Sequence, residues 1–271
     1  MRIKRVLMVT VALAITSFVG AACSTTASPA QTTGGGGSRQ LIGLFRLTPG
    51  TDVSGQLAGS WFRMLEPGGT VAKGKYMRNA ASPADGGLAT LLTPGTAGGL
   101  RTGGYQSQPA PAFDTGGNSL ADSILQPTTF FGVKFSVSTN RTDLQTKTVV
   151  PPPTIVLRNG KLAANLASWA ASWNKQNFNQ GAPKPVQSTA AKSPGQAQAQ
   201  RAWDWVSQRW LGAVPKATIT GNGATGTIDL STGRFTLEWT SLIVGGPFNG
   251  FTGIWHLQGV YHASGQAPAG A

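Results

Sequence analysis

The sequence predicts a mainly β protein, with a single antiparallel sandwich or barrel domain over residues 41–263 and one inserted amphipathic helix. The 271-residue chain is rich in glycine (37 residues) and proline (17 residues). Short apolar runs lie between turn-forming clusters, which is typical of many short strands. Several of these runs alternate apolar with polar residues, which is the period of a half-buried strand.

The first half of the domain carries a series of strand signals separated by turn formers. Those signals are, in chain order, residues 41–47, 60–65, 70–80 and 130–138. The first two end at Pro-Gly pairs, and the last alternates strictly between apolar and polar positions. Asn159-Gly160 lies between two further apolar runs and predicts a tight hairpin.

The segment that follows this hairpin fits two structures. In residues 162–178, leucines and tryptophans fall at helical spacing, but Trp169, Ala171 and Trp173 also alternate as a strand would. Its alanines favour a helix, whereas the hairpin turn just before it favours a strand. The asparagine- and glutamine-rich residues 174–185 are either a solvated loop or a polar ligand-binding edge, and Asn174 and Phe178 are the binding candidates.

The predicted helix covers about residues 194–211. Ser193 can cap it, Pro194 suits its first position, and Gly212 can end it. Trp203, Val206 and Trp210 then share one face, which we expect to pack on the sheet or, as the alternative, to contact a partner.

Residues 216–263 return to a strand pattern. Residues 221–226 ("GNGATG") match G-x-G-x-x-G, but a dinucleotide site needs this motif to open a helix. Here "TIDLSTGRFTLEW" follows, which indicates two strands, so we interpret the glycines as a turn and predict no cofactor.

The stretch "VGGPFNGFTGIWHLQG" at residues 244–259 is predicted to connect two strands, over residues 235–244 and 252–262. Its glycines and proline suit a turn. Phe248 and Phe251 at the tip either contact a sugar or lipid ligand or fold back into the domain. Residues 264–271 are predicted to be a disordered tail.

Catalytic signals are weak throughout the chain. The two histidines cannot alone supply a three-ligand zinc site, so we predict no metal site. No sequence motif for a catalytic nucleophile is present either. A glycosidase needs two carboxylates that flank its bond. Asp114 and Glu238, which have aromatic neighbours in sequence, are the candidates for a glycan- or lipid-active hydrolase, although aspartates near turns usually bond locally.

The first residues predict export. Arg2, Lys4 and Arg5 precede an apolar run over residues 6–19, which is too short to span a bilayer comfortably. A basic start, a short apolar middle and small residues at the end are typical of a signal peptide, here residues 1–22.

Ala21, Ala22 and Cys23 resemble the lipobox of bacterial lipoproteins, and Gly20 departs from the branched residue usual there. The resemblance implies that the Cys23 thiol is acylated and anchors the chain on the extracytoplasmic side of the cell membrane. The alternative is ordinary cleavage after Ala22. Residues 23–40 would form the anchor and a flexible Gly/Ser/Thr tether.

Charge narrows the possible partners. The chain has 22 basic and 9 acidic residues, a net charge of +13, and the basic residues are scattered. A nucleic-acid protein normally clusters them, so we predict no nucleic-acid partner. Scattered positive charge suits general solubility, an anionic membrane surface, or an anionic wall polymer or envelope glycan.

The C-terminal stretches "GTIDLSTGRFTLEW" and "GGPFNGFTGIWHLQG" resemble the C-terminal half of an uncharacterised family of exported bacterial β-proteins. That resemblance implies strands and carries no known catalytic residues. The function we expect is therefore a non-enzymatic binding or structural module at the envelope surface, with the hydrolase as its rival.

Overall fold

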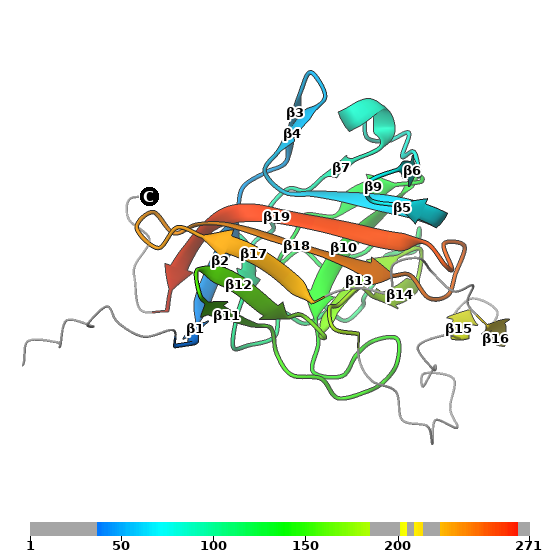
Figure 1. Cartoon of the computed structure of the whole chain (residues 1–271). Helices are drawn as coiled ribbons and strands as arrows, with labels where there is room; N and C mark the ends of the chain where they lie inside the picture. The colour runs from blue at the N-terminus through cyan, green and yellow to red at the C-terminus, as the bar shows by residue number, and fades with distance from the viewer. Residues whose placement is uncertain (1–36, 185–200, 205–208, 214–222, 265–271) are drawn as a thin grey trace, which may run out of the picture. The chain divides into compact units, whose positions relative to one another are not determined.

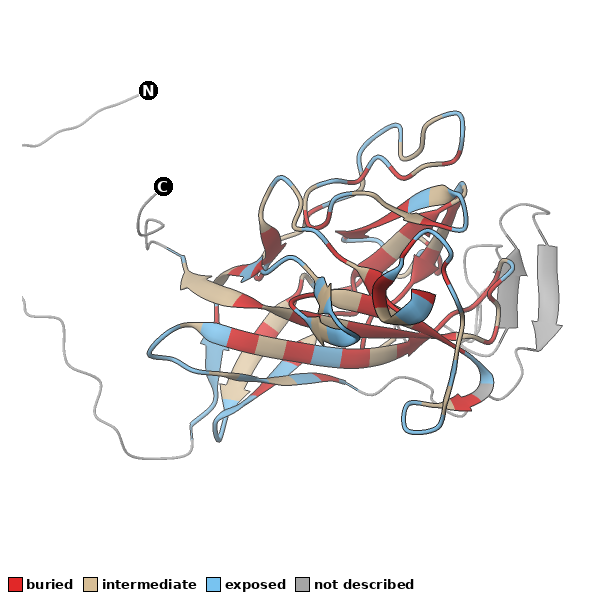
Figure 2. Ribbon diagram, turned by 90° about the horizontal axis from the view of Figure 1, so that it is seen from above, coloured by how far each residue is buried: buried red, intermediate tan, exposed pale blue. Residues whose placement is uncertain are grey.

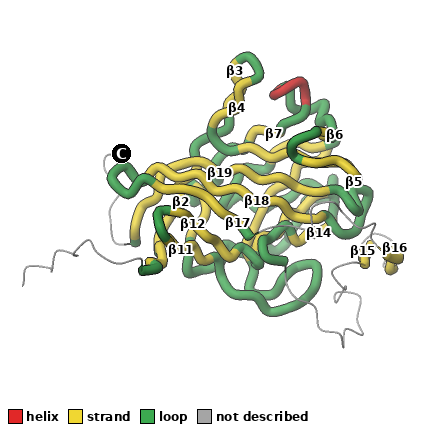
Figure 3. The backbone as a smooth tube through the Cα atoms, in the orientation of Figure 1, coloured by secondary structure: helices red, strands yellow, loops and turns green. Residues whose placement is uncertain are grey.

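The computed structural model describes residues 37–184, 201–204, 209–213 and 223–264. These residues form β-strands with one short 3-10 helix, Ala84–Gly87, as the tube view in Figure 3 shows. Every strand pair is antiparallel. The predicted mainly β, antiparallel class is confirmed.

Most strands belong to one large sheet (Figure 1). Its main path runs, in spatial order, through β1 (Arg39–Leu41), β11 (Thr154–Arg158), β12 (Lys161–Asn165), β17 (Ala224–Ile228), β18 (Arg234–Leu242), β19 (Thr252–Ala263), β2 (Gly43–Leu47) and β8 (Gly99–Arg101). The remaining members are β5 (Trp61–Thr70), β6 (Gly74–Tyr76) and β7 (Thr90–Leu91). β5 pairs with the first half of β19, and β2 pairs with its second half.

The large sheet curls back on itself. β1 stands at one end of the path and β2 near the other, yet only Ile42 separates them in the chain. Gly226 and Gly259 sit where a Cβ would collide with the Thr236 and Arg46 carbonyls of neighbouring strands. Gly226 lies within strand β17, which begins at Ala224 inside the glycine motif, and not in the predicted turn.

A second sheet covers part of the first. It contains β14 (Gln176–Asn179), β13 (Trp169–Trp173), β10 (Val133–Thr139) and β9 (Thr128–Phe130), in that order. The segment 162–178 is thus built of strands, as its preceding hairpin turn favoured. Two short hairpins complete the described strands: β3 (Thr51–Val53) with β4 (Gln56–Ala58), and β15 (Arg201–Asp204) with β16 (Arg209–Ala213).

The predicted helix at 194–211 is wrong for its described residues. β15 and β16 pair antiparallel there, with Trp203 in register with Trp210. A spacing of seven residues fits one helix face, but it also fits opposed positions in a hairpin. Aromatic residues favour strands, and cross-strand aromatic pairs stabilise them. Residues 194–200 and 205–208 lie outside the described residues.

The core lies between the facing sides of the two sheets, where buried residues concentrate in Figure 2. Trp239 and Trp255 of the large sheet contact Trp169 of β13, with ring centroids 5.3 and 5.5 Å apart. Inside the curl, Phe45 meets Phe235 at 5.0 Å. Burial alternates in the middle of β19, from Trp255 to Val260, as the strand pattern requires. In the described part of the chain, no helix has the length and apolarity to cross a membrane.

Candidate functional site

The aromatic loop at residues 243–251 connects β18 to β19 and folds back onto the second sheet. Phe248 at its tip is buried. Its ring lies 5.6 Å from that of Phe130 and 5.3 Å from that of Trp173, and Phe251 packs against it at 5.8 Å. The loop is therefore a packed hairpin connection, as one of its two interpretations required.

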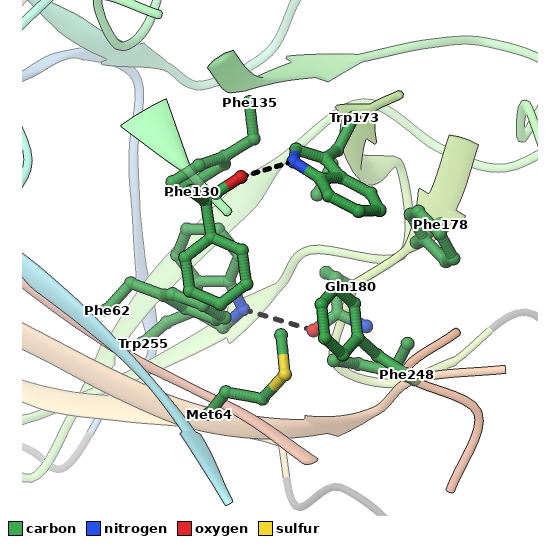
Figure 4. A pocket seen from close by; sticks show the side chains of 11 residues that line it. Phe62, Met64, Phe130, Phe135, Trp173, Phe178, Gln180, Phe248 and Trp255 are labelled. Carbon is green, nitrogen blue, oxygen red and sulfur yellow. Dashed lines mark hydrogen bonds between the residues drawn. The ribbon is translucent and has the colours of Figure 1, made fainter. Parts of the chain in front are cut away.

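An apolar cavity lies beneath this loop (Figure 4). It measures about 40 Å³, and Phe248 and Phe178 are among its lining residues, whereas Phe251 and Asn174 are not. The indole of Trp173 donates a hydrogen bond to the Phe130 carbonyl at 2.7 Å. A space of this size holds about one water molecule, and an apolar lining offers a water too few partners. The cavity is a packing gap, and ligand binding by these four residues stays a prediction.

The two candidate carboxylates, Asp114 and Glu238, lie in different surroundings. Asp114 accepts hydrogen bonds from the Asn118 side chain at 2.8 Å and the Asn118 backbone at 2.9 Å, and these bonds lower its pKa. It borders a shallow surface pocket with Asp122 and Lys134, and Glu238 is not part of that pocket. Asp114 thus stabilises its own turn, as is usual for aspartates near turns.

Glu238 lies on the outer face of the large sheet, in register with His256. The carboxylate Oε1 is 2.6 Å from His256 Nδ1. The His256 ring stacks on Trp61 of β5, with centroids 4.8 Å apart and planes within 2°. The guanidinium of Arg63 lies 5.1 Å from the Trp61 ring and pairs with Asp85. Hydrogen bonds and ring contacts thus link these side chains across β18, β19 and β5.

The rest of the outer face can be followed by register, because directly opposed residues point to the same side of a sheet. Glu238 opposes Thr225. Two residues along β17, Thr227 opposes Lys161, which opposes Arg158. These side chains all share the outer face with Glu238.

On the other side of β18 the same rule adds more cations. Arg234 opposes Val260, which opposes Arg46, and the next row holds His262, Leu44 and Arg101. We call the outer-face residues Arg46, Arg101, Arg158, Lys161 and Arg234 the basic face. All five are exposed, and none has a side-chain hydrogen bond or ion pair to another described residue. Within its strands the main path of the sheet contains one carboxylate, Glu238, and the turn that joins β17 to β18 adds Asp229, which lines a surface pocket together with Arg234.

A buried polar network was missed by sequence reasoning. Asp143, which is fully buried, accepts hydrogen bonds from the Asn179 side chain at 2.7 Å and the Thr146 backbone at 2.6 Å. Lys184 Nζ donates to the Asn179 carbonyl at 2.5 Å. Burial lowers the pKa of Lys184 to about 7, and the Asp143 charge opposes that shift.

The same network uses amides that the sequence placed in a loop or a binding edge. Gln145 accepts from the Asn179 backbone at 2.9 Å and donates to the Val244 carbonyl at 2.5 Å. The backbone carbonyl of Gln180 accepts a hydrogen bond from the Trp239 indole at 2.8 Å. Because each partner lies far away in the chain, polar composition alone could not reveal that these side chains are buried.

No family model, curated protein or solved structure matches the chain. Among the described residues, no three or more histidine, cysteine, aspartate or glutamate side chains gather as a metal site would require. Among the features described above, we take the basic face as the candidate ligand surface.

Proposed function

We propose that the protein is a lipid-anchored, non-enzymatic binding module of the cell envelope, and that the basic face is its ligand surface. The observation that carries this proposal is the gathering of five exposed cations without protein partners on one side of one sheet. Like charges on one face repel one another unless an anionic partner or counterions cover them. An anionic wall polymer or envelope glycan has the complementary charge.

The anchor rests on the N-terminal residues, which lie outside the described part of the chain. An acylated Cys23 would hold the protein in the bilayer, because each buried methylene contributes about 0.8 kcal/mol. Residues 24–38 would then form the tether that lets the domain reach past the headgroups, because Arg39 and Gln40, which the sequence placed in the tether, belong to β1. Cys23→Ser should move the protein from the membrane fraction to the soluble one. A serine variant that stays with the membrane would contradict the anchor.

The hydrolase is the weaker candidate. A glycosidase needs two carboxylates facing one bond. Glu238 is engaged by His256, and Asp114 is held in a turn by Asn118.

The packing of the two sheets supports a sandwich. We infer that the architecture is closer to a sandwich than to a barrel, because aromatic rings of the large sheet pack against rings of the second sheet.

The ligand surface is tested with matched variants of the purified full chain. Arg158→Gln, Lys161→Gln and Arg234→Gln together remove three charges from the basic face. Lys73→Gln, Lys75→Gln and Lys175→Gln remove three exposed charges elsewhere. We expect the first variant to lose sedimentation with isolated envelope material and the second to retain it. Equal loss in both variants would show that net charge, and not the basic face, drives binding.

A further inference from the structure

One end of the basic face is hollowed into a shallow pocket of about 880 Å³. Arg46 of β2, Arg101 of β8 and His262 of β19 line it, beside the turn at residues 94–98. We call it the Arg46 pocket. It is far larger than the apolar cavity between the sheets, and its volume lies in the range of known ligand sites.

The strand register sets the spacing of Arg46, Arg101 and His262. His262 and Arg101 oppose Leu44 from its two sides, so their backbones lie two strands apart, roughly 10 Å. Arg46 follows Leu44 by two residues, roughly 7 Å along the strand. The three side chains therefore surround one area of the sheet, with Leu44 between them.

The lining of the Arg46 pocket lacks any carboxylate. Arg46, Arg101 and His262 have no side-chain hydrogen bond or ion pair within the described residues. The backbone amides of the adjoining turn are already used, since Thr96 and Ala97 donate to the Asp122 and Ser123 carbonyls at 2.7 and 2.9 Å. Side chains, and not the turn backbone, are thus free to bind an anion.

We propose that the Arg46 pocket binds a phosphate group of a phosphodiester polymer other than a nucleic acid; this inference rests on the proposed function and names its ligand class. A carboxylate is planar and can be satisfied by one bidentate arginine. A tetrahedral phosphate directs oxygens in several directions, which suits two guanidinium groups and an imidazole that approach from three strands. Leu44, Val260 and Pro94 supply an apolar floor for the carbon backbone of the polymer.

The pocket continues into the remainder of the basic face, which favours a polymer over a lipid headgroup. Arg46 and Arg234 oppose Val260 from its two sides. Lys161 and Arg158 lie in the adjacent row on β12 and β11, beyond Thr236 of β18 and Thr227 of β17. A chain with repeated phosphates can contact all of these residues in sequence, whereas a single headgroup fills only the pocket.

The experiment measures the Kd of the purified full chain for synthetic poly(glycerol phosphate) by calorimetry. Arg46→Gln with Arg101→Gln should weaken binding roughly tenfold or more, since a hydrogen bond to a charged group contributes about 1.5–3 kcal/mol. Lys73→Gln with Lys175→Gln, which removes the same charge outside the pocket, should change the Kd less than about twofold. Polyglutamate should bind weakly and should not distinguish the two variants. Unchanged melting curves would show that both variants are folded.

Other ligands give the results that would overturn the proposal. Vesicles with anionic phospholipid that bind more tightly than the polymer, and lose binding in the Arg46/Arg101 variant, would make the pocket a headgroup site. A DNA oligonucleotide that binds more tightly than poly(glycerol phosphate) would make nucleic acid the partner.

The two proposals can fail separately. If the Arg46/Arg101 variant binds as the wild type does while the Arg158/Lys161/Arg234 variant does not, the pocket is wrong and the proposed function stands. If neither variant changes binding, or if the wild type binds neither polymer nor envelope material, both are wrong.

Discussion

The two faces of the large sheet use the same strands in opposite ways. On the inner face, Trp255 is 1% exposed and its ring contacts other aromatic rings. On the outer face, its neighbour His256 is half-buried, and beyond it lie cations without protein partners. The aromatic packing therefore lies on one face of the sheet, and the proposed ligand surface lies on the other. Substitutions of the adjacent residues Trp255 and His256 can therefore test the two faces separately.

The largest effect is expected at Trp255. Trp255→Ala should lower the free energy of unfolding by about 3–5 kcal/mol, because it removes a buried aromatic side chain and leaves a cavity. His256→Ala removes a partly exposed hydrogen bond to Glu238 and a ring contact, and should cost about 1 kcal/mol or less. Urea denaturation of both variants measures the difference. Equal costs would contradict the division between the faces.

A comparable but smaller effect is expected at the loop tip. Phe248→Ala should cost about 3 kcal/mol, at the lower end for a buried phenylalanine, because the ring lies beside an existing gap. Phe251→Ala should cost less, since this ring is half-buried. Thermal melts compare the two. A Phe248 variant as stable as the wild type would mean that the loop is not part of the core and would revive its role as a ligand contact.

The buried network predicts a pH-dependent effect. Lys184 has a pKa of about 7 in the folded chain, whereas an unfolded lysine has a pKa of about 10.4. Between these values the unfolded chain binds more protons, so this residue makes stability rise with pH over that range.

The test compares wild type with Lys184→Met by urea denaturation between pH 7 and 10. We expect the stability of the wild type to improve relative to the variant as the pH rises. Parallel curves would show that the folded chain does not lower the pKa of Lys184.

The alternating strands could be predicted from sequence because period-two patterning is local. The helix at 194–211 failed because Trp203 and Trp210 are seven residues apart, which suits a helix face and a hairpin pair equally. Local pattern does not decide between them; pairing does.

The basic face was hidden for a related reason. Arg46, Lys161 and Arg234 are far apart in the chain, so they read as scattered charge. Strand register alone brings them to one side of the sheet. The scattering of basic residues along the sequence therefore does not argue against a polyanionic partner, and DNA binding has to be measured beside polymer binding. The network around Asp143 was hidden in the same way, because its partner Asn179 lies 36 residues away.

The smallest effect on stability is expected on the basic face itself. Arg158→Gln, Lys161→Gln and Arg234→Gln should each change the free energy of unfolding by less than about 0.5 kcal/mol, since exposed residues without partners contribute little. Relief of repulsion between these charges can even raise stability slightly. Urea denaturation checks this. A loss above 2 kcal/mol in any of them would mean that the face is structural.

The salt dependence of polymer binding tests the central claim most directly. An anionic polymer that contacts several cations releases counterions, so log Kd rises linearly with log salt concentration. We expect a steep slope for wild type, a clearly shallower slope for the Arg158/Lys161/Arg234 variant, and an unchanged slope for the Lys73/Lys75/Lys175 variant. Identical slopes for all three proteins would contradict the account, because the basic face would then contribute no more to binding than charge elsewhere.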